Sequence, residues 1–386
     1  MNIGIIGKGT ASIITTLVLL QRGHNITILY DPDTQPINVG ESTTPHIQEL
    51  LYEVLGLSIG NMVDKGIFSY KMGINFVNWG KGKSFHHHFN GPISTAHHFE
   101  TKPFNDFIHK HLEENKIVNY IPEKINHIVP EDDTVRLNDH TFDFVVNCAG
   151  WKNGENYITP FFQTVNSAQL FVDNQDCPYY EDLYTMHLAT EDGWQFGLPF
   201  PNLNVFKCGY LYDKNQISHE DVTEKLKKSN KKVHSTFSWE PKYSKELIVH
   251  KRLALNGNIL FFFEPLQALS LLYFYYSSIH IADYLDNFCM EKLDNCNYSY
   301  NVDMWAYQLS LAYHYQYGSI HDTEFWRKVT KEAKQIMSSS LNGNLDIRKM
   351  NWERDCRFKD KEQSYSQIGS FHVEDLKQIH YGMTTE

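Results

Sequence analysis

The sequence predicts an α/β fold built on a parallel sheet, and the pattern at the start of the chain is the main reason. The apolar run from Ile3 to Ile6 is typical of a buried parallel strand. An apolar helix is expected from Ala11 to about Leu20, and a second strand over residues 25–30. The 386 residues are enough to bury a large core and to form two joined subdomains.

The turn between the first strand and the helix carries a ligand-binding pattern. Gly7 and Gly9 permit a tight turn and a close approach of the backbone, and Ser12 is small enough to replace the usual third glycine. Asp31 follows the second strand, 22 positions after Gly9. Such a unit places a pyrophosphate on the helix N-terminus and a carboxylate on a ribose 2′-hydroxyl. We therefore predict a Rossmann-type dinucleotide site formed by Gly7, Gly9, Thr10, Ala11, Ser12 and Asp31.

A secretory signal peptide is the alternative interpretation of the same apolar segment. No basic segment precedes the apolar residues 13–20, and no A-x-A cleavage site follows them. A strand is expected where the mature terminus of a secreted protein would lie. The dinucleotide site is therefore the favoured interpretation.

The composition argues against several classes of function. The formal net charge of −11 disfavours a nucleic-acid partner. The six cysteines form no CxxC pair, so reduced thiols and a cytoplasmic location are expected. No uninterrupted run of 18 or more apolar residues occurs, so we expect neither a membrane span nor a membrane partner.

A polar loop with the sequence NVGESTTP precedes a helix that is expected over residues 45–55. Thr43 or Thr44 could cap this helix, with Pro45 in its first turn. Taken alone, the segment is only a polar loop before a helix. Next to a dinucleotide-binding turn, it could instead face a flavin through Gly40, Glu41, Ser42 and Thr43.

Apolar and polar residues alternate from Phe68 to Trp79 well enough to predict a strand. Lys71 is an isolated cation within this segment. The residues alone favour a solvated lysine on that strand. A functional lysine is the alternative.

Several motifs together resemble the flavin-dependent tryptophan halogenase family, and they occur in order from residue 3 to about residue 326. GKGTAS, VGESTTP and YKMGINFVNW stand where the family has GGGTAGW, VGEATIP and FKxxIKFVNW. Further similarities are FHHHF, AHHFE, FVVNCAG, GWQFGLP, FEPL, and HY followed by DTEFW. The chain is identified as a shortened, divergent member of this family.

The resemblance implies an oxidoreductase that uses FAD supplied as FADH2, O2 and a halide, with a separate flavin reductase as partner. In the family, the flavin reaction yields hypohalous acid, which moves through a tunnel to a second site. By resemblance, Lys71 would hold it there, by a hydrogen bond or as a haloamine, for attack on an electron-rich phenol, aniline or indole. Lysine suits this task because its ammonium is a strong donor and its pKa falls readily on burial.

The resemblance also assigns other site residues. Around the flavin it implies Trp194, Glu264, Pro265 and Leu266. For the aromatic substrate it implies His87, Phe89 and Phe196, with Trp194 and Phe196 separating substrate from flavin.

These aromatic and histidine residues also have simpler interpretations. Trp194 and Phe196 could be core aromatics, and His97 and His98 are expected to be core or hydrogen-bonded residues. Consecutive histidines at 86–88 suggest a metal patch, but neighbouring side chains of a strand point to opposite faces. No metal is therefore expected.

Three departures from the family pattern bear on function. The family's catalytic glutamate falls on Gln267, which cannot take a proton from the ring intermediate, and Asn75 replaces a common second lysine. A strongly apolar helix is expected from Pro265 to about Tyr284. The halide-binding pair falls on Leu269 and Ser270, where backbone amides at a helix start could still bind an anion. The residues next to this anion site are apolar, and an apolar site penalises the strongly hydrated chloride most. We therefore expect the enzyme to use iodide or bromide in preference to chloride. Gln267 also leaves open a non-halogenating flavoprotein monooxygenase, oxidoreductase or flavin-binding protein of the same fold.

The domain organisation is expected to follow the flavin-monooxygenase type, with an added mostly α-helical part on the substrate side. We expect a discontinuous FAD-binding module, a strand-rich layer over the flavin, and a helical cap over the substrate. Their expected bounds are 1–165 with 250–285, 166–249, and 286–386. The family is longer, and the residues missing after Phe89 would normally cover the substrate. A homo-oligomer is left open.

Overall fold

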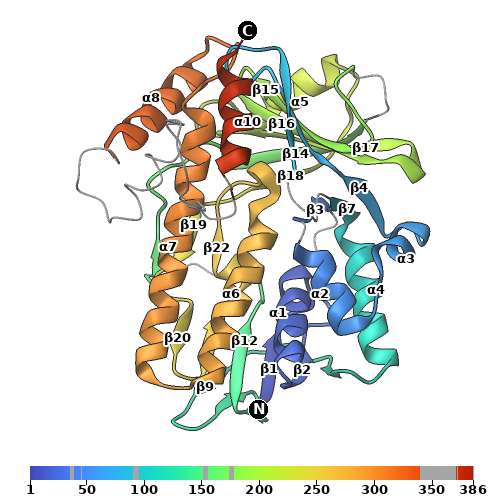
Figure 1. Cartoon of the computed structure of the whole chain (residues 1–386), viewed down its shortest axis with the longest axis vertical. Helices are drawn as coiled ribbons and strands as arrows, with labels where there is room; N and C mark the ends of the chain where they lie inside the picture. Colours follow the sequence, from blue (N-terminus) through green and yellow to red (C-terminus); the bar gives the residue numbers. More distant parts are fainter. Residues whose placement is uncertain are drawn as a thin grey trace. The chain divides into compact units, whose positions relative to one another are not determined.

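The computed structural model describes residues 1–34, 39–44, 46–89, 95–150, 155–173, 178–339, 371 and 373–385 (Figure 1). Contacts divide the chain into two compact units. Unit 1 consists of Met1–Phe68, Phe99–Thr159 and Pro241–Met304. Unit 2 consists of Ser69–His98, Pro160–Glu240 and Trp305–Glu386.

This division differs from the three parts expected from the sequence. Ser69–His98 belongs with the strand-rich residues of unit 2, although we expected it within the FAD-binding module. The first part of the long helix expected in the cap belongs to unit 1. The reason is sheet pairing: a strand of the early segment pairs in parallel with a strand more than a hundred residues later.

Unit 1 is built on a six-stranded sheet with the order β20-β21-β12-β1-β2-β8. β1 pairs in parallel with both β12 and β2, so the predicted strand, helix and strand at the start of the chain are confirmed. β20 pairs antiparallel with β21 at one edge. The bounds are β1 Asn2–Ile6, β2 Asn25–Leu29, β8 Asn119–Ile121, β12 Phe144–Asn147, β20 Ile248–His250 and β21 Leu253–Leu255.

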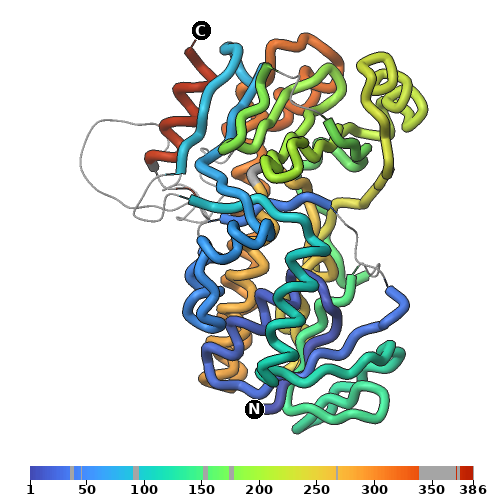
Figure 2. The backbone as a smooth tube through the Cα atoms, turned by 90° about the vertical axis from the view of Figure 1, so that its right-hand side faces the viewer, coloured from blue at the N-terminus to red at the C-terminus, as the bar shows by residue number. Residues whose placement is uncertain are grey.

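The helices of unit 1 gather around α1, which packs against α2, α4 and α6 (Figure 2). Nearly all of α1 is buried, which explains why its sequence is apolar on every side. The bounds are α1 Thr10–Gln21, α2 His46–Leu55, α3 Ile59–Asp64, α4 Thr101–Glu114 and α6 Leu269–Asp286.

One expectation about these helices needs correction, and one of the two candidate caps of α2 is excluded. We expected the last of them to begin at Pro265, but a 3-10 turn over Leu266–Ala268 precedes α6, whose first residue is Leu269. The interruption occurs because Ala268 has a left-handed backbone, with φ +56°. Thr44 does not cap α2, since its buried hydroxyl has no hydrogen-bond partner within the described part of the chain.

Short strands complete unit 1. β9, β10 and β11 form an antiparallel sheet whose apolar side chains pack on Ile6, Leu29 and Val145. β13, β19 and β22 form another small sheet. The bounds are β3 Gly40–Ser42, β9 Ile128–Pro130, β10 Val135–Leu137, β11 His140–Phe142, β13 Tyr157–Ile158, β19 Lys242–Ser244, β22 Phe261–Phe262 and the 3-10 turn Gly257–Ile259.

Unit 2 is built on a seven-stranded sheet with the order β18-β14-β17-β16-β15-β5-β6. β5 and β15 pair in parallel, and the other neighbours pair antiparallel. The single strand expected from Phe68 to Trp79 is instead two strands, β4 and β5, that separate at Met72. The bounds are β4 Phe68–Lys71, β5 Gly73–Val77, β6 Ser84–His88, β7 Ala96–Glu100, β14 Ser167–Asp173, β15 Tyr184–Thr190, β16 Gly193–Phe200, β17 Val205–Tyr212 and β18 Val233–Ser238.

Helices cover this sheet, and α10 packs against β6. The long helix α7 begins in unit 1 and ends in unit 2. The bounds are α5 His219–Lys228, α7 Met290–Tyr315, α8 Glu324–Ser339, α10 Val373–Thr384 and the 3-10 turn Pro201–Leu203. Within the described ranges, no helix is both long enough and apolar enough to cross a membrane.

One buried amide joins the elements of unit 1. Asn256 is fully buried, and its Nδ2 donates to Thr15 Oγ1 at 2.9 Å, Ser278 Oγ at 2.9 Å and the Phe274 carbonyl at 3.0 Å. Its Oδ1 accepts from the backbone N–H of Gly257 at 2.7 Å. A single side chain therefore connects α1 to α6, and its partners have no water to replace it.

We expect Asn256→Ala to lower the free energy of unfolding by about 3 kcal/mol, because it leaves several buried polar groups without partners. Calorimetry of the purified chain would show this as a lowered Tm. Asn25→Ala is the matched control, because it removes an exposed amide that makes one bond to Asn2. Equal Tm values for the two variants would contradict the role assigned to Asn256.

Candidate active site

The turn before α1 is shaped for a ligand. Gly7 has φ +110°, and a Cβ there would lie 3.0 Å from the carbonyl oxygen of Cys148, so no larger residue fits. Gly9 caps α1 with an ordinary φ of −102°, and a Cβ there would meet no atom within 4 Å. The protein fold itself therefore does not require glycine at position 9. The open space lies at a helix start, where backbone N–H groups of the first turn attract an anion.

The predicted residues Thr10 and Glu41 meet at this helix start, together with one residue that the sequence did not reveal. Thr10 Oγ1 donates to Asn105 Oδ1 at 3.2 Å and also lies 3.4 Å from Glu41 Oε2. Burial raises the pKa of Glu41 to about 7. Asn105 lies on α4, and its buried Nδ2 has no hydrogen-bond partner among the residues described. A polar ligand would supply one.

Asp31 is suited to bind hydroxyl groups. Its carboxylate accepts from the backbone N–H of Asp33 at 2.9 Å, and this bond holds its pKa below the usual value, with Lys124 also contributing. The carboxylate is therefore ionised near neutral pH and remains an acceptor. Nearby, the Lys8 ammonium lies 4.3 Å from the ring centroid of Tyr30. The sequence analysis had not singled out Lys8 or Tyr30.

The segment that leads into α6 and its first turn contain the predicted residues Glu264, Pro265, Leu266, Leu269 and Ser270. Glu264, Leu266 and Leu269 are buried. The left-handed backbone of Ala268 ends the 3-10 turn, and the first-turn backbone amides of an 18-residue helix follow it. The side chain of Gln267 lies outside the described part of the structure.

In unit 2, Lys71 is almost completely buried, with 1% of its surface exposed. Its Nζ lies 5.3 Å from the ring centroid of Phe89. Burial lowers the pKa of Lys71 to about 7. The interpretation of Lys71 as a solvated strand residue is therefore wrong, and the structure places Lys71 beside Phe89.

His87 lies on the buried face of β6, the strand that pairs with β5. It pairs in register with Ile74 on β5 and is buried, and its Nε2 lies 3.2 Å from Asp375 Oδ1 on α10. Its neighbours His86 and His88 point to the other face, as strand alternation predicted. Among the described residues, no three metal-binding side chains converge.

Asn75, at the position of the family's second lysine, also points to that other face. Its Nδ2 donates to Glu181 Oε1 at 2.9 Å, and the same carboxylate contacts His86. Asn75 therefore belongs to a polar cluster on the face opposite His87.

Trp194 lies in unit 2, whereas the other predicted flavin residues lie in unit 1. Trp194 is fully buried. Its ring centroid lies 4.8 Å from that of His187 and 6.5 Å from that of Trp79. Phe196 follows two positions later, on the same face of the strand. Trp79 and His187 were not singled out from the sequence, because a single buried aromatic or histidine has no local signature.

The neighbouring histidines are core residues, as expected. His98 is completely buried, and its Nε2 lies 2.8 Å from Thr185 Oγ1. His97 is also buried, and burial lowers its pKa to about 4. Burial also keeps the pKa of His98 well below its usual value, with a further contribution from Lys71.

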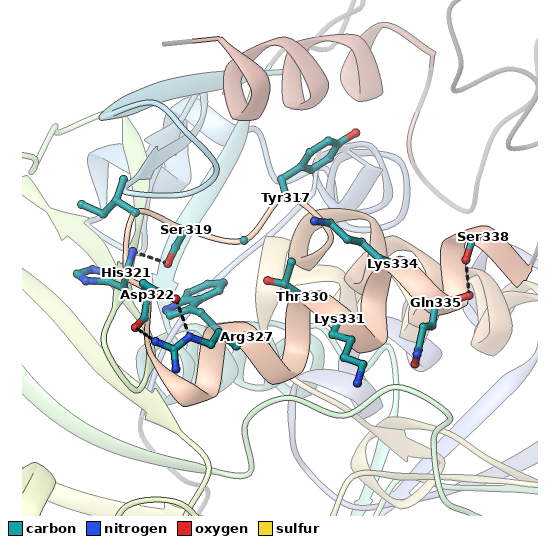
Figure 3. A pocket seen from close by; sticks show the side chains of 13 residues that line it. Tyr317, Ser319, His321, Asp322, Arg327, Thr330, Lys331, Lys334, Gln335 and Ser338 are labelled. Carbon is teal, nitrogen blue, oxygen red and sulfur yellow. Dashed lines mark hydrogen bonds and ion pairs between the residues drawn. The ribbon is translucent and has the colours of Figure 1, made fainter.

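A separate pocket of about 580 Å³ lies along α8 and the segment that precedes it in unit 2 (Figure 3). Arg327, Lys331 and Lys334 make its wall cationic, although Arg327 is paired with Asp322 at 2.7 Å. It contains none of the predicted site residues.

A family model described as tryptophan halogenase matches residues 2–117 and 90–366. The chain belongs to the tryptophan halogenase family. It is therefore an FAD-dependent halogenase, and its chemistry uses FADH2, O2 and a halide. Members of the family take an aromatic substrate and receive reduced flavin from a separate reductase.

Relatives of this halogenase support the assignment. The tryptophan 6-halogenase ThaL of Streptomyces albogriseolus is 24% identical, over 86% of this chain and 78% of ThaL. The tryptophan 7-halogenase RebH of Lentzea aerocolonigenes is 21% identical, over 96% of this chain and 85% of RebH. In fold, the chain resembles the tryptophan 6-halogenase SttH of Streptomyces toxytricini, with a TM-score of 0.82, 17% identity, and coverage of 100% of this chain and 90% of SttH.

The residues of unit 1 fit the FAD of this halogenase. Gly9 leaves open space at the helix start, Asn105 offers an unsatisfied buried donor, and Asp31 offers an ionised acceptor. Ser12 Oγ donates back to the Gly9 carbonyl at 2.9 Å, which fixes the first turn. Thr43, at the end of the GEST loop, is buried against the same helix.

We expect Gly9→Leu to weaken FAD binding by at least about tenfold while leaving the fold intact, because only the ligand space is filled. Flavin fluorescence quenching would measure the affinity, and circular dichroism would confirm the fold. Gly60→Leu is the matched control, since a Cβ at this exposed helical glycine also meets no atom within 4 Å. Unchanged FAD affinity in Gly9→Leu would contradict the assigned site.

Proposed function

We propose that Lys71 holds hypohalous acid and directs its halogen onto an electron-rich aromatic ring. Reduced FAD, when bound, supplies the oxidation of halide by O2. The observation that carries the proposal is the burial of Lys71 beside the ring of Phe89, with a pKa near neutrality. Such an amine is a strong hydrogen-bond donor when protonated, and it gives up its proton readily.

The transfer step follows from these properties. The Lys71 ammonium donates a hydrogen bond to the oxygen of hypohalous acid and polarises the oxygen–halogen bond. A π electron pair of the substrate forms the new carbon–halogen bond, and the oxygen leaves as water with the proton of Lys71. The substrate ring lies by His87 and Phe89, with Phe196 on the same sheet face as further aromatic wall.

The substrate class is expected to be broad: activated phenols, anilines or indoles. The support is the short connection after Phe89, where the family carries a covering insertion. Residues 90–94 of this connection lie outside the described ranges. A pocket with fewer walls binds a ligand less tightly, because it buries less of the ligand surface.

The halide site is proposed at Leu269 and Ser270, where first-turn amides of α6 would bind the anion. Leu269 is buried, and Ala268 and Leu266 add apolar surface. An apolar anion site disfavours chloride, which is the most strongly hydrated of the three halides. We therefore propose a preference for iodide or bromide.

We expect Lys71→Met to abolish halogenation while FAD binding and oxygen consumption persist. Loss of one positioned acid typically lowers a rate about 10²–10⁴-fold. Product would be measured by mass spectrometry after supply of FADH2, O2 and bromide. Lys242→Met is the matched control, because Lys242 is another buried lysine, 4.7 Å above the Tyr157 ring in unit 1. Near-normal product formation by Lys71→Met would rule the proposal out.

The pH dependence should follow Lys71. Its pKa is about 7, so the ammonium predominates below this pH and the neutral amine above it. If the ammonium acts by hydrogen bond, the halogenation rate falls as pH rises through about 7. Burial keeps the pKa of the neighbouring His98 and His187 well below the usual value, so these rings stay neutral across that range. A halogenation rate that rises with pH would instead favour a haloamine, because the neutral amine of Lys71 is the form that reacts with hypohalous acid.

A competition among iodide, bromide and chloride on one activated phenol tests the halide order. We expect iodination and bromination to exceed chlorination, with a soluble hypohalite trap as control for uncatalysed reaction. In Gln267→Glu, some chlorination should appear if the added carboxylate assists the ring. Chlorination by the unmodified enzyme as fast as iodination would show the proposed order to be wrong.

A flavoprotein that oxidises without halogenation is the second candidate, and Gln267 is the observation that keeps it open. The same assay separates the two. Carbon–halogen products that require added halide support the halogenase, and oxygenated products that form without halide support the alternative.

A further inference from the structure

His187 is a buried histidine on the sheet face proposed for the substrate. It lies on β15, where it pairs in register with Phe76 of β5 and Phe196 of β16, and only 2% of its surface is exposed. Phe76 and Ile74 are two positions apart on β5, and Ile74 pairs with His87. His187 and His87 therefore share one face of the sheet.

Aromatic rings fix the imidazole of His187 in place. Its ring centroid lies 5.2 Å from that of Phe76, at an interplanar angle of 90°, and 4.8 Å from that of Trp194. On its far side, Phe76 stacks on His314 of α7 at 5.7 Å. The imidazole thus sits in apolar surroundings with little rotational freedom.

One nitrogen of this ring is unsatisfied. Nδ1 of His187 is buried and has no hydrogen-bond partner within the residues that the structure describes. Other buried histidines of unit 2 use a ring nitrogen: His87 with Asp375 and His314 with the Ser310 carbonyl. His98 contacts Thr185 through Nε2, although its Nδ1 also has no partner among the described residues. A buried polar atom without a partner costs about 1–3 kcal/mol, so its retention suggests a ligand or a role in reaction.

The halogenation chemistry has an unfilled role that suits this nitrogen. After the carbon–halogen bond forms, the ring must lose a proton to recover aromaticity. The family assigns a carboxylate to this part of the reaction, but the position is Gln267 here. A neutral imidazole with a free lone pair accepts protons, whereas an amide does not.

We infer that His187 accepts the proton that the aromatic ring loses after halogen transfer, and is thereby a further catalytic residue. The inference rests on the proposed function of Lys71. The bond between the ring carbon and its hydrogen breaks, its electron pair returns to the ring, and the proton binds Nδ1. No additional oxidant or reductant is needed.

Transfer of this proton from His187 to Lys71 then restores both side chains. Lys71 has given its proton to the departing water and is a neutral amine, while His187 is an imidazolium. Burial keeps the pKa of His187 well below its usual value, and the charges of Lys71, His314 and His87 lower it further. The pKa of Lys71 is about 7, so the proton moves downhill from His187 to Lys71. Both groups return to their starting states.

The test uses the full-length enzyme with FADH2, O2 and bromide, and 1,3,5-trimethoxybenzene as substrate. This arene has no acidic O–H or N–H that could lose a proton in place of the ring. We expect His187→Asn to lower the bromination rate about 10²-fold or more. Removal of the ring proton should then limit the rate, so the ring-deuterated substrate should react more slowly than the protiated one. The unmodified enzyme should brominate the deuterated and the protiated substrate at the same rate.

Two further variants separate a chemical role from a structural one. His187→Ala leaves a cavity, and added imidazole should restore part of its rate. Replacement of His187 by 1,2,4-triazol-3-ylalanine, which has nearly the same shape but less basic nitrogens, should fold normally and show the same isotope effect. His98→Asn is the matched control, a buried histidine on β7 that should show no isotope effect.

The results of this test separate a failure of the inference about His187 from a failure of the function proposed for Lys71. An unmodified enzyme that forms no brominated product defeats the proposed function itself. If the unmodified enzyme brominates, and the triazole variant matches its rate with no isotope effect, the inference about His187 fails alone. An isotope effect in His98→Asn but in no variant of His187 would also overturn it.

Discussion

The burial of one amine, that of Lys71, is the physical constraint on which the chemistry proposed for unit 2 depends. A cation removed from water is strongly destabilised, so the group responds by lowering its pKa. The surroundings keep it there: the ring of Phe89 lies beside it, and His98 and His187 are held neutral by their own burial. A lysine in water would be fully protonated at pH 7 and would be a poor proton relay. In the proposed mechanism, burial allows the same side chain to donate a proton and to recover it near neutral pH.

Unit 1 solves a different problem, the binding of a large anionic cofactor with few charged side chains. Gly7 turns the chain with a backbone that other residues rarely adopt, and Gly9 leaves the helix start open. In the proposed site, Asn105 and Thr10 present polar atoms rather than charges, and Asp31 supplies an ionised acceptor. Backbone amides are fixed by the fold and need no specific side chain. Ser12 can replace the usual third glycine because it is small enough for close packing of helix and strand.

The sequence predicted what depends on local pattern and missed what depends on tertiary packing. The strand, turn and helix at Ile3 to Leu20 could be predicted because apolar period and glycine spacing are local signals. The burial of Lys71 could not, because it depends on strands and helices that come far later in the chain. Asn105 carried a weak signal, a polar residue on the apolar face of a helix, whereas His187 carried none. The start of α6 was misplaced because the left-handed backbone of Ala268 has no sequence signature of its own.

The polar atoms of unit 2 show how a site can change its chemistry without changing its fold. On β5, alternation directs Asn75 to a polar cluster with Glu181, while Phe76 on the other face packs against His187. A charged residue at position 75 would therefore not reach the face that carries His87. The buried face instead combines one amine with neutral imidazoles and aromatic rings. In such an environment a carboxylate would be costly to keep ionised, whereas an imidazole is neutral at rest and becomes charged only during the reaction.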